Sequence, residues 1–291
     1  MAEYKIKDLE TLTGIKAHTI RIWEKRYNFL SPDRTDTQIR TYTDEELTLL
    51  LNIAILNKNG IKISKIADLS SQQIAQKVWE IRGKHTVDNS TELLILSLIE
   101  LDEQLFNTTL QKIINERGLT GAFINYLIPF LDRIGVMWLV GSISTAQEHF
   151  ISNLIRQKII SETDKLDIPA SFENPVMLFL PEHEWHEISL LFYHFILRSK
   201  GLPTIYLGQS LPYESMLECV EKLKPRVLVT SWLTATDERF ILNYFANLIK
   251  DTKDLPIYAG GFQIETFTGK LPKEINRISD ITVLDQVLKA I

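Results

Sequence analysis

The sequence predicts a multidomain chain: a winged helix-turn-helix head, a four-helix bundle, and an α/β doubly wound five-stranded parallel sheet. Residues 1–72 contain two short helical patterns around a glycine turn. Residues 75–165 show helical spacing of apolar positions in four stretches, 91–100, 103–117, 121–140 and 145–165. In residues 175–291, apolar runs of strand length alternate with helical stretches. Residues 166–175 carry two prolines and no apolar period, which predicts a linker before the sheet domain.

The composition is that of an ordinary globular protein, with 45% hydrophobic and 24% charged residues among 291. No apolar run is long enough to span a bilayer, and the start lacks the apolar segment of a secretory signal, so we expect a cytoplasmic protein. The single cysteine, Cys219, excludes an internal disulfide and a cysteine-cluster metal site. Because the net charge is −5, a nucleic-acid partner has to be bound by a local basic patch.

The head carries such a patch. Residues 6–12 and 18–27 are predicted helices, and residues 32–42 are predicted to form a two-stranded wing. Between Lys16 and Tyr42 there are six Lys or Arg residues against three acids, so the patch can neutralise phosphates while the second helix enters the major groove. The alternative is a solvated helix face, which the ordered set of features disfavours. The expected DNA contacts are Lys16, His18, Thr19, Arg21, Lys25, Arg26, Arg34, Arg40 and Tyr42.

The motifs of the head closely resemble the winged MerR-type transcription regulators over roughly the first 70 residues. The resemblance is carried by Tyr4-Lys5-Ile6, by residues 19–27, and by Pro32-x-Arg34-Thr35 through Arg40-x-Tyr42. Gln38 departs from the family, whose wing turn often has glycine, the residue that reaches positive φ without strain. The resemblance implies a DNA-binding regulator whose wing turn differs in shape.

In the helical middle, Trp138 follows a stripe at helical spacing, and Glu148-His149 begins the next helix among small residues. Small residues around an acid–imidazole pair leave room for a ligand beside the bundle core. The alternative is a tryptophan that caps the bundle and a hydrogen-bonded surface histidine. These residues alone favour that alternative.

Three short blocks each follow a predicted strand of the C-terminal part. The predicted strands are residues 176–180, 203–208, 227–232, 256–259 and 281–284. The carboxyl ends of parallel strands form the ligand crevice of such a sheet, so the blocks are expected to converge. They bring together His186, the hydroxyl of Ser231, and the bare backbone of Gly260 and Gly261. This set suits a large cofactor that needs an axial metal ligand and a narrow slot beside the sheet. A zinc site involving His183 and His194 is the alternative, but no cysteine lies nearby.

The blocks Glu184-x-His186-x-x-Ser189, Ser231-x-Leu233 and Gly260-Gly261, with their spacings, are similar to the cobalamin-binding module of methionine synthase and the corrinoid mutases. The resemblance implies that His186 replaces the cofactor's benzimidazole as the lower cobalt ligand. Glu184 would then fix the imidazole tautomer, and Ser231 would extend that network or meet the displaced nucleotide tail. The two glycines would let the tail pass close to the backbone. Ser189 stands where the family normally has glycine, so its side chain could crowd the tail.

Trp138, followed after nine residues by Glu148-His149, resembles the helical cap of the CarH-type photoreceptors, which combine these three parts in this order. The resemblance implies that Trp138 and Glu148 contact the adenosyl group of adenosylcobalamin, and that His149 becomes a cobalt ligand after photolysis. It predicts a light-responsive repressor that is tetrameric in the dark and releases operator DNA when photolysis disrupts the oligomer. Such a protein is not an enzyme.

Two alternatives remain open. One is a light-independent MerR-type regulator that senses cobalamin or another ligand. The other is a corrinoid carrier for an enzyme, for which 291 residues leave no space for a catalytic barrel.

Overall fold

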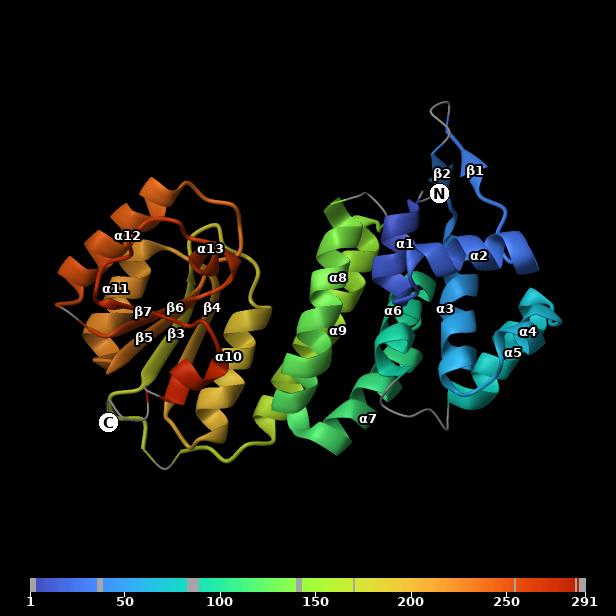
Figure 1. Ribbon diagram of the computed structural model, residues 1–291. Coiled ribbons are helices and arrows are strands. Elements are labelled where there is room, and N and C mark those ends of the chain that lie inside the picture. Colours follow the sequence, from blue (N-terminus) through green and yellow to red (C-terminus); the bar gives the residue numbers. More distant parts are fainter. Residues whose placement is uncertain are drawn as a thin grey trace. The chain divides into compact units, whose positions relative to one another are not determined.

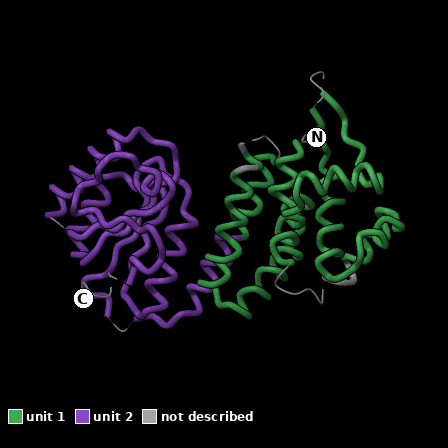
Figure 2. The backbone as a smooth tube through the Cα atoms, in the orientation of Figure 1, with its two compact units in different colours: residues 1–154 green, residues 155–291 purple. Residues whose placement is uncertain are grey.

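The computed structural model describes residues 4–35, 39–82, 89–139, 143–169, 171–253, 255–285 and 287. These residues form two compact units, 1–154 and 155–291 (Figure 2). The boundary falls inside one helix, α9 (Thr145–Asp164), so this helix contributes residues to both units. The division of the chain into three domains stays a prediction, and Gln38 lies outside the described residues.

The first unit begins with the predicted head. Its helices are α1 (Ile6–Thr13), α2 (Ala17–Tyr27), α3 (Asp44–Lys58), α4 (Ile63–Ala67) and α5 (Ser71–Arg82) (Figure 1). Helix α1 ends at Gly14, whose φ of 72° is the left-handed conformation that terminates many helices. The wing is an antiparallel pair, β1 (Asp33–Arg34) and β2 (Arg40–Thr41), extended by a bridge between Tyr4 and Tyr42. The helix-turn-helix and its wing are therefore confirmed.

The helical middle consists of α6 (Ser90–Glu100), α7 (Glu103–Ala122), α8 (Ile128–Leu139) and α9, with a short π-helix, η2 (Phe123–Leu127), before α8. We expected a helix to end at residue 117 and another to begin at residue 121. Instead α7 continues through a kink at Gly118, whose backbone is not helical. Among the described residues, no helix is long and apolar enough to cross a membrane.

The second unit contains a five-stranded parallel sheet in the order β4-β3-β5-β6-β7. Its strands are β3 (Val176–Pro181), β4 (Thr204–Leu211), β5 (Val227–Ser231), β6 (Ile257–Gly260) and β7 (Ile275–Arg277). The helices between them are α10 (Ile188–Ser199), α11 (Tyr213–Leu223), α12 (Glu238–Asp251) and α13 (Phe262–Glu265). The chain moves outward from β3 to β4 and then returns to the other side of β3. The point where this order reverses is the usual ligand crevice of such a sheet.

The predicted fifth strand, residues 281–284, is wrong. This segment is a 3-10 helix, η3 (Ile281–Leu284), which begins where the carboxylate of Asp280 accepts the Thr282 N–H at 2.7 Å. The fifth strand is β7 instead. Because β7 lies at the edge of the sheet and pairs only with β6, it buries Ile275 and lacks the continuous apolar run of a central strand.

His194 on α10 is a packed histidine of the second unit. Its Nε2 lies 3.0 Å from Thr204 Oγ1, and its ring stacks on Tyr206 with the centroids 5.2 Å apart. Burial, assisted by the charge of Arg198, lowers the pKa of His194 to about 4. The imidazole is therefore neutral in the folded chain at neutral pH.

This lowered pKa predicts that the chain loses stability in mild acid. The folded-state pKa, about 4, lies below the ordinary value of 6.5, so the unfolded state takes up the proton first as the pH falls. From about pH 7.5 to about pH 5, His194 should reduce the free energy of unfolding by roughly 2 kcal/mol. Urea unfolding of wild type and His194→Gln at both pH values measures this. An equal loss in the two proteins would contradict it.

Candidate cofactor site and nucleic-acid interface

Glu184 ties together the two loops at the reversal of strand order. It follows β3, and its side chain is almost completely buried. Its Oε2 accepts the backbone N–H groups of Leu233 at 2.8 Å and Thr234 at 2.7 Å, both in the loop after β5. One carboxylate therefore fixes two neighbouring loops at the carboxyl edge of the sheet.

The other oxygen of Glu184 orients His186. Oε1 lies 2.8 Å from His186 Nδ1, and it accepts the His186 backbone N–H at 2.9 Å and the Thr234 hydroxyl at 2.9 Å. Burial alone would raise the pKa of Glu184, but these bonds, first that of the His186 ring, together with the loop amides lower it to about 2.

The ionised carboxylate determines the imidazole tautomer. Glu184 has no proton to give at neutral pH, so Nδ1 of His186 carries the proton between them, and in the neutral imidazole Nε2 then holds the lone pair. This is the state in which imidazole coordinates a transition metal, with a carboxylate behind it. The His186 side chain is 54% exposed, so the ring lies at the surface of the carboxyl edge. His186 and Glu184 thus meet as the sequence predicted.

The hydroxyl that completes this network comes from Thr234, which the sequence analysis missed. Ser231, the residue expected there, is 1% exposed and ends β5. Thr234 Oγ1 lies 3.2 Å from His186 Nδ1 and donates to Glu184. A hydroxyl residue three positions beyond Ser231 was the available sequence clue.

The two glycines pack against the chain itself. A Cβ added at Gly260 would lie 2.4 Å from the Tyr193 hydroxyl, and one at Gly261 would lie 2.4 Å from the Trp232 carbonyl oxygen. Gly261 also has a φ of +90°, which disfavours any side chain. Protein atoms therefore occupy both Cβ positions, and the passage of a nucleotide tail close to this backbone stays a prediction.

A second buried carboxylate adjoins His186. Glu187 is 6% exposed and uses both oxygens: Oε1 accepts from Arg156 Nε at 2.6 Å and from a second guanidinium nitrogen, and Oε2 accepts the Tyr206 hydroxyl at 2.6 Å. Arg156 lies on α9 and Tyr206 on β4. We call these three residues the Glu187 clamp. It anchors the loop that carries His186 to a helix and to a strand.

The zinc alternative finds no support in the described residues, where no group of three His, Cys, Asp or Glu side chains could bind a metal ion. His194 is packed between Thr204 and Tyr206. His183 has a positive φ of 70°, and its backbone N–H donates to Ser210. Neither joins His186.

The predicted cap residues belong to the first unit. Ile134 is buried, whereas Trp138 at the end of α8 is 48% exposed. Such exposure favours a ligand contact over a tryptophan that caps the bundle core. Glu148 and His149 lie near the start of α9, with His149 Nδ1 3.3 Å from the Glu148 carboxylate. Their role toward an upper cobalt face stays a prediction.

In the head, α2 buries Ile20 and half-buries Trp23, and the opposite face carries His18, Arg21, Lys25 and Arg26 in the solvent. Thr19 is half-buried, and Arg34 is exposed on the wing. Lys16 pairs with Glu10 at 3.1 Å, and Arg26 lies over the Tyr27 ring.

Ile22 lies within this basic face and is 52% exposed, but it was not predicted as a DNA contact. An exposed isoleucine there can meet a thymine methyl group.

Two predicted DNA contacts hold the wing in place. Tyr42 is fully buried, and its hydroxyl donates to Glu24 at 3.3 Å. Arg40 pairs with the same carboxylate at 3.1 Å. The wing is thereby fixed to α2, and Tyr42 does not lie on the exposed face as expected.

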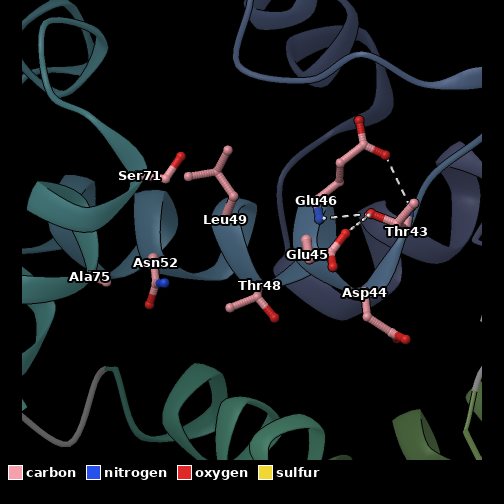
Figure 3. Close-up of a pocket in the computed structure, with 9 residues that line it drawn as sticks. All are labelled: Thr43, Asp44, Glu45, Glu46, Thr48, Leu49, Asn52, Ser71 and Ala75. Atoms are coloured by element: carbon pink, nitrogen blue, oxygen red, sulfur yellow. Dashed lines mark hydrogen bonds between the residues drawn. The ribbon is translucent and has the colours of Figure 1, made fainter. Parts of the chain in front are cut away.

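A pocket in the head is lined by acids at the start of α3 (Figure 3). Glu46 accepts the Thr43 N–H, and the Thr43 hydroxyl accepts the Glu46 N–H, a reciprocal cap that satisfies the helix start. Asp44 accepts the Tyr4 hydroxyl at 2.7 Å. These carboxylates serve the fold and indicate no cofactor site.

Comparison with known proteins finds matches for the head and for the helical segment. Residues 4–73 match the family model of the MerR HTH family regulatory proteins, and residues 91–160 match that of a B12 binding domain. The chain is 27% identical over 271 residues to the HTH-type transcriptional repressor CarH of Myxococcus xanthus, covering 90% of each protein. The chain is a CarH-type regulator.

Two further relatives fit this assignment. The repressor CarA of Myxococcus xanthus is 24% identical over 269 residues, which are 88% of this chain and 86% of that protein. The regulator MlrA of Escherichia coli is 34% identical over 73 residues, or 25% of this chain and 30% of that protein. In this CarH-type regulator, the B12 match covers the helical segment and is separate from the His186 loop. The indication of a corrinoid from this match therefore does not depend on the His186 loop.

The Glu187 clamp of this CarH-type regulator predicts a charge rescue. Arg156→Met leaves a buried carboxylate without its cation and should cost about 3 kcal/mol of folding free energy. The double variant Arg156→Met with Glu187→Gln removes the buried charge and should regain part of that loss. Urea unfolding measures both, with the exposed Arg239→Met as the matched control. A double variant less stable than Arg156→Met would contradict the clamp.

The basic face of α2 predicts the salt dependence of DNA binding. Arg21→Ala should weaken binding and reduce the slope of log affinity against log salt by about 1, because one phosphate contact is lost. The measurement is fluorescence anisotropy with a duplex selected by wild type from random DNA. Lys222→Ala, an equal charge change on α11, is the control. An unchanged slope for Arg21→Ala would remove this residue from the interface.

Proposed function

We propose that this CarH-type regulator is a light-responsive transcriptional repressor with adenosylcobalamin as chromophore. The observation that carries the proposal is the Glu184–His186 pair, a buried ionised carboxylate that leaves imidazole Nε2 unprotonated at the carboxyl edge of the sheet. The relatives named CarH and CarA are repressors by name, and the match of residues 91–160 to a B12 binding domain supports a corrinoid.

The surroundings of His186 suit a corrin ring. Three large apolar side chains lie exposed in the segments after β3, β5 and β6: Trp185 at 60%, Leu233 at 42% and Phe262 at 57%. Apolar side chains with a few oriented polar groups are the usual lining of a cofactor site. In this proposal His186 would supply its Nε2 to cobalt, with Glu184 and Thr234 holding its ring.

The adenosyl group is assigned to residues of the first unit. Trp138 and Glu148 would hold this group, and His149 would supply an imidazole nitrogen to cobalt after illumination. Bound adenosylcobalamin supplies a cobalt–carbon bond that light breaks. The residues of the chain bind and orient the cofactor. Once Trp138 and Glu148 lose their contact with the adenosyl group, the helical bundle is free to move.

The light signal acts on DNA binding, in which several heads of one oligomer bind the operator together. In the dark the chain forms a tetramer, whose heads bind an operator with high effective concentration. Loss of the adenosyl contact disrupts the oligomer, so the affinity for DNA falls because fewer heads are joined. The protein therefore acts as a ligand switch and turns over no substrate.

Illumination provides the test. Wild type mixed with adenosylcobalamin should sediment as a tetramer in the dark and as a smaller species after green light, with the spectrum of histidine-ligated cobalt. His186→Ala should lose that spectrum, and His183→Ala, a neighbouring histidine, should keep it. Sedimentation unchanged by light would leave a light-independent corrinoid sensor. A His186→Ala spectrum equal to that of wild type would refute the ligand assignment.

A further inference from the structure

The space beside Gly260 is filled by the side chain of Tyr193. Tyr193 lies on α10, is 9% exposed, and places its hydroxyl 2.4 Å from where a Cβ of Gly260 would be. Its ring carbons Cζ and Cε2 lie 3.1 and 3.2 Å from the same point. Gly260 is therefore glycine because the phenol of Tyr193 occupies that position.

Tyr193 does not act alone. Ser189 lies four residues earlier on α10, so the two side chains stand on one face of the helix, one turn apart. Gly261 is the next residue of the chain. A Cβ added there would meet the Trp232 backbone and would lie 2.8 Å from the Ser231 hydroxyl oxygen. The Cβ positions of both glycines are thus occupied by protein atoms.

From this packing we infer that Tyr193 determines which corrinoids the chain accepts, by excluding a lower nucleotide tail from the slot beside Gly260. The inference rests on the proposed corrinoid function and adds the class of cofactor. A corrinoid without the tail, such as adenosylcobinamide, offers His186 an open lower face. In adenosylcobalamin, the lower base must first be displaced from cobalt, which costs free energy. The displaced tail then has no buried site whose contacts would offset this cost. The chain therefore binds adenosylcobinamide at least as tightly as adenosylcobalamin.

The direct test is the pair of dissociation constants of wild type for adenosylcobinamide and adenosylcobalamin, measured in the dark by equilibrium dialysis. A value for adenosylcobinamide equal to or lower than that for adenosylcobalamin is expected. Tighter binding of adenosylcobalamin would overturn the inference and leave the proposed function intact. If neither corrinoid binds, the proposed function and the inference are both wrong.

Variants locate the effect at Tyr193. Tyr193→Ala should shift the ratio of the two constants about tenfold toward adenosylcobalamin, whereas Tyr193→Phe, which keeps the ring, should retain the wild-type ratio. Phe195→Ala is the matched control, since Phe195 is equally buried on α10 at 9% exposure but points about 200° away around the helix. A Tyr193→Ala protein that folds, by circular dichroism, with the ratio of wild type would contradict the inference. If that variant does not fold, the wild-type ratio decides.

Discussion

The buried carboxylate of Glu184 is the constraint on which the cofactor site depends. With one oxygen it holds the Leu233 and Thr234 amides, and with the other it holds the His186 ring. A carboxylate buried to this degree is stable only because its bonds are complete, as its lowered pKa shows. The carboxylate that fixes the two loops also orients the imidazole of His186. The hydrogen bonds that hold these loops together therefore also position the candidate metal ligand.

The Glu187 clamp extends this constraint to a helix. Glu187 follows His186 directly, and Arg156 belongs to α9, the helix that carries Glu148 and His149 near its start. His149 and Arg156 are seven residues apart, so they stand on one face two turns apart. Within the second unit, the part of α9 that carries Arg156 is thus bonded to the loop that carries His186.

The sequence predicted the features that depend on local patterns. The helix-turn-helix, the helical middle and the first four strands follow from apolar periodicity. The Glu184–His186 pair was expected from the resemblance of the three blocks to the cobalamin-binding module. What it missed depends on packing between distant segments. Thr234 lies outside the motif, and Arg156 and Tyr206 come from two other elements. The filling of the Gly260 space by Tyr193 could not be inferred, because a bare glycine has the same sequence whether a ligand or a phenol lies beside it. The edge strand β7 was missed because an edge position demands few apolar residues.

Electron paramagnetic resonance of the Co(II) corrinoid bound to the chain tests the central claim most directly. An axial nitrogen of natural isotope splits each cobalt line into a triplet, and a ¹⁵N nucleus splits it into a doublet. If His186 is the lower ligand, protein labelled with ¹⁵N-histidine should give doublets, and unlabelled protein should give triplets. Triplets that persist in the labelled protein would place the cofactor's own base on cobalt, and the account built on the Glu184–His186 pair would be wrong.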